Sequence, residues 1–248
     1  MSVPDSFQRR YHRWNRSNAA AVILFSGVIL AFPRVWNGGL AAGAYVLFGL
    51  WGAAALLRLY RFGRSMLPTT GDTWPADLLT ATRGVAATIL LVVLGTAGEA
   101  LYSAPSRWVL LVFLAVSETT DFFDGRVARR RGPSRFGSTW DMENDAFFTV
   151  ALSHAALLVS GARSVFVLIG LMRYLYVLFL PYHSAPPWVP AAYRRYAKVV
   201  AAATVVTQIV VLAPLIPTAV RTTALATILI LLLISFTWDL LLHRRSKP

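Results

Sequence analysis

Four aspartates stand in two pairs whose spacing suits metal binding. Asp121 and Asp124 are three residues apart and Asp141 and Asp145 are four apart, so each pair lies on one face of a predicted helix. The short polar stretch between the pairs predicts antiparallel neighbouring helices with the pairs opposed. Four carboxylates at the edge of an apolar region need a positive partner. The chain has no cysteine, and the one nearby histidine, His154, lies well inside a predicted span. The ligands are therefore oxygens, which favour Mg²⁺, Mn²⁺ or Ca²⁺ over Zn²⁺. Two such ions about 3.5–4 Å apart would suit a displacement at phosphorus.

Small and basic residues accompany the aspartates. Gly125, Ala128 and Gly137 would let a flat, bulky group approach the backbone on the metal-facing side of both helices. Arg129 suits a bidentate contact to a phosphate. The alternative is a short polar loop that is simply charged and solvated. That alternative fits the other arginines of this stretch, but not the aspartates, because each aspartate pair shares one helical face.

The rest of the chain is apolar enough for a polytopic helical membrane protein. Hydrophobic residues make up 56% of the 248 residues and charged residues 14%, which is unlike a typical soluble domain. Several apolar segments approach the roughly 20 residues that a transmembrane helix needs, although the first is short. The eight predicted spans are residues 18–33, 39–60, 84–104, 107–123, 141–161, 163–181, 196–215 and 220–242. The helical pattern is too regular for a β-barrel, so the predicted fold class is an all-α membrane bundle.

The basic residues predict how the bundle is oriented. The net charge is +13, from 24 Lys and Arg against 11 Asp and Glu. Only Arg34, Arg107, Arg163 and Arg221 fall on one side of the predicted spans, and the others fall on the side of both termini. By the positive-inside rule we expect both termini in the cytoplasm and the chain in the cell membrane. The charge then serves topology and attraction to anionic lipid, not nucleic-acid binding.

The aspartate stretch as a whole resembles a family signature. The pattern is Asp121-x2-Asp124-Gly125-x2-Ala128-Arg129-x7-Gly137-x3-Asp141-x3-Asp145. It is similar to the signature of the CDP-alcohol phosphotransferase family, integral membrane enzymes of phospholipid synthesis. The resemblance implies that an alcohol attacks the β-phosphorus of a CDP-linked donor and releases CMP. It implies that the four aspartates hold two Mg²⁺ or Mn²⁺ ions and that Asp145 also deprotonates the acceptor. The residues it assigns to the CDP site are Asp121, Gly125, Ala128, Arg129, Gly137 and Asp141.

The resemblance also divides the chain into parts. It implies a catalytic core of six transmembrane helices in residues 84–248, preceded by a two-helix transmembrane extension in residues 18–60. Residues 1–17, where aromatic residues stand among arginines, are expected to form a cytoplasmic interfacial segment. Residues 61–83, rich in Pro, Gly and Thr, are expected to form a cytoplasmic linker with an interfacial helix. Members of the family are often homodimers, so a homodimer is an expectation here.

Two further sets of residues outside the signature are candidates for the site. Thr80 and Arg83 are similar to its T-x-x-R element in the nucleotide site, although Asp77 stands where the family usually has Asn. The predicted acceptor site is a cationic cytoplasmic cluster of Arg173, Arg194, Arg195 and Lys198. This cluster favours a phosphorylated or otherwise anionic acceptor for the phosphatidyl group of CDP-diacylglycerol.

Two other functions fit part of the pattern. The same signature serves the transfer of a headgroup from a soluble CDP-alcohol to a lipid hydroxyl, and the sequence leaves that direction open. A cation transporter could also use an aspartate cluster. Transport carboxylates tend to lie near the membrane midplane, however, and these lie at one predicted edge.

Two polar residues inside predicted spans have their own interpretation. His154 lies well inside a span and is expected to be a core histidine with satisfied hydrogen bonds, not a metal ligand. Glu143 lies between Asp141 and Asp145. For Glu143 two interpretations stay open, a supporting partner of the site or a residue that faces solvent.

Overall fold

A computed structural model describes residues 4–31, 40–67, 74–131, 135–179 and 189–245. Within these ranges, side chains are described except at residues 40, 74–76, 99, 120–131, 135, 179 and 243–245. The described chain folds into helices and contains no strand, which confirms the all-α fold class. The helices are α1 (Asp5–Ala31), α2 (Leu40–Met66), α3 (Trp74–Thr96), η2 (Gly98–Tyr102), α4 (Ala104–Arg131), α5 (Arg135–Val159), η3 (Ser164–Val167), α6 (Leu168–Phe179), α7 (Ala191–Val210) and α8 (Thr218–Arg245).

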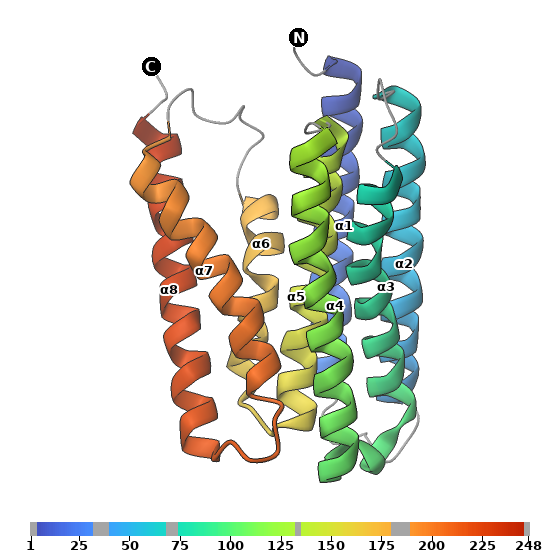
Figure 1. Cartoon of the computed structure of the whole chain (residues 1–248), viewed down its shortest axis with the longest axis vertical. Coiled ribbons are helices and arrows are strands. Elements are labelled where there is room, and N and C mark those ends of the chain that lie inside the picture. Colours follow the sequence, from blue (N-terminus) through green and yellow to red (C-terminus); the bar gives the residue numbers. More distant parts are fainter. Residues whose placement is uncertain (1–3, 32–39, 68–73, 132–134, 180–188, 246–248) are drawn as a thin grey trace.

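The long helices pack side by side as an elongated bundle (Figure 1). α1 begins and α8 ends at the same end of the bundle. α3 begins at this end as well, and α4 ends and α5 begins there. The aspartate pairs and the T-x-x-R element are therefore carried toward the same end of the bundle, where α3 packs against both α4 and α5 along its length.

Three of the described helices contain segments long and apolar enough to cross a membrane. These segments are Ala41–Met66, Asp77–Thr96 and Thr218–Leu242. Together with the apolar composition they indicate an integral membrane protein. The predicted count of eight spans, and the side of the membrane on which each end lies, stay predictions.

Several helix boundaries differ from the prediction, two of them in the N-terminal part of the chain. The predicted interfacial segment and the first predicted span form one continuous helix, α1, because residues 5–26 contain neither Gly nor Pro to interrupt it. The predicted linker at 61–83 is helical at both ends, since α2 continues to Met66 and α3 begins at Trp74. Pro75 lies in the first turn of α3, where its missing N–H removes no helical hydrogen bond.

α5 is the central helix of the bundle. It packs against α2, α3, α6 and α7, and its residues Phe148, Leu152 and Ala155 are completely buried. Gly52 of α2 faces Phe147 of α5, and a methyl group at Gly52 would overlap the phenyl ring. The glycine therefore allows the two helices to approach closely. Side chains carried on such a tightly packed element are held in place more precisely than side chains on a loop.

The two N-terminal helices share the hydrophobic core with the rest of the bundle. Val22 of α1 and Phe48 of α2 belong to the same buried cluster as residues of α3 and α5. His154 of α5 is completely buried; its Nε2 atom lies 3.0 Å from Ser26 Oγ and its Nδ1 atom 3.1 Å from the Tyr45 hydroxyl. Both ring nitrogens thus have a hydrogen-bond partner, as a buried imidazole requires. His154 is a core histidine, as predicted, and it ties α1 and α2 to the central helix.

Candidate active site

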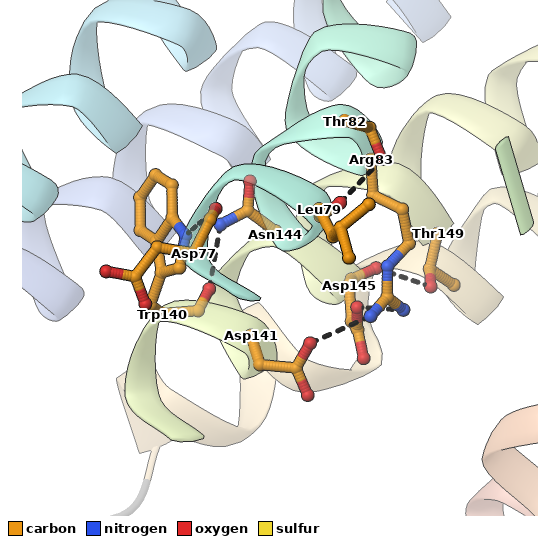
Figure 2. A network of polar contacts seen from close by, with 9 residues as sticks. All are labelled: Asp77, Leu79, Thr82, Arg83, Trp140, Asp141, Asn144, Asp145 and Thr149. Carbon is orange, nitrogen blue, oxygen red and sulfur yellow. Dashed lines mark hydrogen bonds and ion pairs between the residues drawn. The ribbon is translucent and has the colours of Figure 1, made fainter. Parts of the chain in front are cut away.

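Arg83 of α3 bridges two carboxylates of α5. Its Nη2 atom lies 2.8 Å from Asp141 Oδ1, and its Nη1 atom forms an ion pair with Asp145 (Figure 2). The two aspartates are one helical turn apart, so a single guanidinium reaches both. The Arg83 side chain is only 5% exposed, whereas those of Asp141 and Asp145 are 44% and 41% exposed. The two carboxylates therefore have a buried cation beside them and are still accessible from outside the bundle.

Two other predicted nucleotide-site residues lie one turn from this ion pair. Thr80 is buried on α3, three residues before Arg83, and Gly137 lies on α5, four residues before Asp141. These spacings place each residue on the same helix face as its neighbour in the ion pair. The structure thus brings residues of the T-x-x-R element and of the second half of the signature together from two helices.

The first half of the predicted signature lies in the C-terminal part of α4. The helix includes the backbone of Asp121, Asp124, Gly125, Ala128 and Arg129, but their side chains lie outside the described residues. Their approach to the aspartates of α5 therefore stays a prediction. Among the side chains that are described, no group of three or more His, Cys, Asp or Glu could hold a metal ion. The predicted four-aspartate site depends on the α4 pair.

Trp140 and Asn144 fix α5 against α3 beside the two aspartates (Figure 2). The Trp140 Nε1–H donates to the Asp77 carbonyl at 3.1 Å, and the Asn144 Nδ2–H donates to the Trp140 carbonyl at 2.8 Å. Asn144 is buried against Gly84, where a methyl group would collide with the Asn144 Oδ1 atom. The Asp77 carboxylate pairs with Arg64 of α2 at 3.2 Å. These contacts set the register of α3 and α5 and so direct the two aspartates toward the bridging arginine.

Sequence reasoning missed the positioning role of Trp140 and Asn144. The sequence does contain a signal for this role. Trp140 and Asn144 each directly precede an aspartate of the signature, so they are four residues apart, as the aspartates are. They form a second stripe on α5, rotated from the carboxylates toward α3 and α2. The departure at Asp77, where the family usually has Asn, coincides with the ion pair that this carboxylate forms with Arg64.

Glu143 is buried and joins three helices. Its carboxylate pairs with Arg173 of α6 and accepts a hydrogen bond from the Tyr11 hydroxyl of α1 at 2.5 Å. The Arg173 Nη2 atom also lies 3.4 Å from the Tyr11 hydroxyl. Burial, and then the negative charge of Glu143, raise the pKa of Tyr11 well above its usual value. Of the two interpretations left open by the sequence, the solvent-facing Glu143 is wrong.

Arg173 stands apart from the other residues of the predicted acceptor cluster. Its guanidinium is held by the ion pair just described, and its side chain is 22% exposed. Arg194, Arg195 and Lys198 are exposed in the first turns of α7, and Arg194 Nη2 donates to the Val189 carbonyl at 3.2 Å. No contact among the described residues joins Arg173 to these three. The cluster consists of one arginine fixed inside the bundle and three exposed cations on another helix.

The long apolar helices indicate an integral membrane protein. An accessible carboxylate pair lies at one end of its helical bundle. The family model for CDP-alcohol phosphatidyltransferase matches residues 74–238, two thirds of the chain, so the chain belongs to this family. The match begins at the first residue of α3 and ends within α8. No curated protein and no solved structure matches the chain.

Family membership places the chain among the membrane transferases of phospholipid synthesis, which move a phosphatidyl group from a CDP-alcohol. It confirms the resemblance drawn from the signature and favours an enzyme over a cation transporter. The helices α1 and α2 lie outside the matched region, although they share its hydrophobic core.

Proposed function

We propose that this protein transfers the phosphatidyl group of CDP-diacylglycerol to the hydroxyl of a small polar acceptor and releases CMP. The acceptor oxygen forms a bond to the β-phosphorus, the bond from that phosphorus to the bridging pyrophosphate oxygen breaks, and CMP leaves with the oxygen. The observation that supports this proposal best is the accessible carboxylate pair, Asp141 and Asp145, which Arg83 holds at the end of the bundle. A site at the edge of apolar helices also suits a donor with lipid tails.

The residues present fit divalent metal ions. Asp141 and Asp145 offer accessible carboxylate oxygens one turn apart, and hard cations prefer oxygen ligands. With Asp121 and Asp124 of α4 they would hold two Mg²⁺ or Mn²⁺ ions. Such ions, when bound, stabilise charge on the attacking and leaving oxygens. The guanidinium of Arg83 adds a fixed positive charge beside the same carboxylates and lowers their mutual repulsion.

Asp145 is the proposed general base. It would accept the proton of the acceptor hydroxyl as the oxygen attacks, which requires hydrogen-bond reach to that hydroxyl. Its 41% exposure leaves room for an acceptor to approach. The small residues of the signature leave space for the nucleotide, and the arginines contact its phosphates. The proposed CDP site consists of Thr80, Arg83, Asp121, Gly125, Ala128, Arg129, Gly137 and Asp141.

The acceptor is proposed to be anionic, such as a phosphorylated polyol. Arg194, Arg195 and Lys198 supply exposed positive charge at the start of α7, and Arg173 is the proposed contact inside the bundle. A cationic site of this kind would hold an acceptor phosphate against the repulsion of the donor pyrophosphate.

We also propose an arrangement in the cell membrane. The chain would cross it eight times, with the active site and both termini on the cytoplasmic side and residues 84–248 as the catalytic core. The common end at which α1 begins, α8 ends, α4 ends and α5 begins supports this arrangement (Figure 1). A homodimer is proposed from the family alone.

Removal of divalent metal is expected to stop the reaction. EDTA should lower CMP release from CDP-diacylglycerol to background, and excess Mg²⁺ or Mn²⁺ should restore it, because the aspartates without ions repel the donor pyrophosphate. CMP is quantified by chromatography with purified protein in lipid nanodiscs. CMP release that persists in protein freed of metal would contradict the two-metal proposal.

A further inference from the structure

Three arginines surround a cavity between α1 and α2, outside the proposed active site. Arg10 comes from α1 and Arg58 and Arg61 come from α2, and all three are exposed. The cavity has a volume of about 540 Å³. Its lining consists of Arg10, Ala54, Leu57, Arg58, Arg61, Phe62 and Ser65. No lining residue is acidic, and within the described part of the chain none of the three arginines forms an ion pair. The cavity offers guanidinium donors to an anion.

The α2 side of this cavity changes character along the helix. Each of its residues has another lining residue three or four positions away, so they form one stripe. The stripe is apolar at Ala54 and Leu57 and carries its two arginines, Arg58 and Arg61, further toward the end of the bundle where α1 begins (Figure 1). The Arg10 guanidinium lies 5.2 Å from the centre of the Phe62 ring, a cation–π contact that holds it beside α2. The positive charge therefore lies at the bundle end and the apolar part lies deeper.

A second cavity adjoins the first and is mainly apolar, although Asp77, Thr88 and Asn144 are among its lining residues. It has a volume of about 370 Å³, lies between α2, α3 and α5, and shares Leu57 with the cavity of the arginines. Leu78, Val85 and Ile89 on its rim are 54%, 55% and 43% exposed, so it opens at the surface of the bundle. Both α2 and α3 contribute candidate membrane spans here. A mainly apolar cavity does not retain water, and in a bilayer the surrounding medium is hydrocarbon.

We propose that the two cavities together bind one anionic phospholipid. Its phosphate would lie among Arg10, Arg58 and Arg61, because guanidinium groups pair with phosphate oxygens bidentately. One acyl chain would pass Leu57 into the apolar cavity. The neighbouring cavities match a molecule with a charged head and an apolar tail, whereas a soluble phosphate compound would use only the first.

This lipid site is separate from the proposed active site. Neither cavity is lined by Arg83, Asp141 or Asp145, and the three arginines belong to helices outside the family match. A lipid bound here would contact α1, α2, α3 and α5, including Trp140 and Asn144. It would thereby stabilise the packing of the N-terminal helices against the helices that carry the site.

Lipid binding is measured by native mass spectrometry of the whole chain titrated with dioleoylphosphatidylglycerol. The double variant Arg58→Gln/Arg61→Gln should weaken binding about tenfold or more, given the usual contribution of each basic side chain. The matched control Arg9→Gln/Arg13→Gln removes the same charge from exposed positions of α1 outside the cavity, and should bind as the unmodified chain does. Equal losses in both double variants would indicate a diffuse charge effect and overturn the site.

A second variant tests the acyl chain. Ala53→Phe fills the apolar cavity without a change of charge, and it should weaken binding of the dioleoyl lipid but not of a dihexanoyl analogue. Glycerol 3-phosphate and inorganic phosphate serve as soluble competitors and should not displace the lipid at equal concentration. Unchanged lipid binding in Ala53→Phe, or displacement by either soluble phosphate, would overturn the assignment to a phospholipid.

Discussion

Asp145→Asn is expected to lower the rate of CMP release by about 10³-fold, within the roughly 10²–10⁴-fold range of general-base contributions. Asparagine keeps the size of the side chain but does not accept the proton of the acceptor hydroxyl. The substitution also removes one carboxylate from the proposed metal ligands. The measurement is the initial rate of CMP release by purified protein with CDP-diacylglycerol, Mg²⁺ and a saturating acceptor.

The control for this variant is Asp5→Asn, which removes the same charge from an exposed residue in the first turn of α1. It should leave the rate unchanged. Asp145→Asn should also retain its fold and its binding of CDP, because Asp145 is 41% exposed and Asp141 keeps its bond to Arg83. Turnover near that of the unmodified protein would show that Asp145 is not the base.

Breakage of the buried pair of Glu143 and Arg173 is expected to destabilise the protein by roughly 3–5 kcal/mol. Glu143→Gln removes the carboxylate that neutralises the Arg173 guanidinium between α5 and α6. Because the Glu143 side chain is completely buried, water does not replace the lost partner. The measurement is the free energy of unfolding in detergent micelles, followed by the loss of helical circular dichroism.

Two further variants show whether charge causes the effect. Tyr11→Phe leaves both charges in place and removes the hydroxyl that donates to Glu143 and lies 3.4 Å from Arg173 Nη2 and from Asn15 Nδ2. It should cost about 1 kcal/mol. The double variant Glu143→Gln/Arg173→Met removes both charges and should be more stable than Glu143→Gln alone. Ordinary surface substitutions change the free energy of unfolding by up to about 0.5 kcal/mol. If Glu143→Gln changes it by no more than that, the buried pair does not stabilise the protein.

The parts of this protein that could be predicted from sequence depend on local patterns. Helical apolar segments predicted the all-α bundle, and the spacing of Asp141 and Asp145 predicted that they share one face of α5. The family match confirms the resemblance that the signature carried. Boundaries were less predictable, because hydropathy marks where a chain is apolar and not where a helix ends. α1 therefore extends through its arginine-rich half as one helix.

The contacts that position the site could not be predicted, because they join residues far apart in the chain. The spacing of Arg83 suggested a nucleotide contact, but its ion pairs with two aspartates 58 and 62 residues away depend on how α3 packs on α5. The burial of Glu143 depends likewise on Tyr11 and Arg173 of two other helices. No local pattern distinguishes such a glutamate from a solvent-facing one.

The measurement that tests the central claim most directly follows donor, acceptor and both products together. The purified 248-residue chain in lipid nanodiscs is supplied with CDP-diacylglycerol, Mg²⁺ and, one at a time, phosphorylated polyols, neutral polyols and amino alcohols. We expect CMP release that depends on the acceptor, with one phosphodiester-linked lipid formed for each CMP and the highest rate for a phosphorylated acceptor. The proposed reaction would be contradicted by two results together. CDP-diacylglycerol would stay intact with every acceptor, and CMP would be released from a soluble CDP-alcohol in the presence of diacylglycerol.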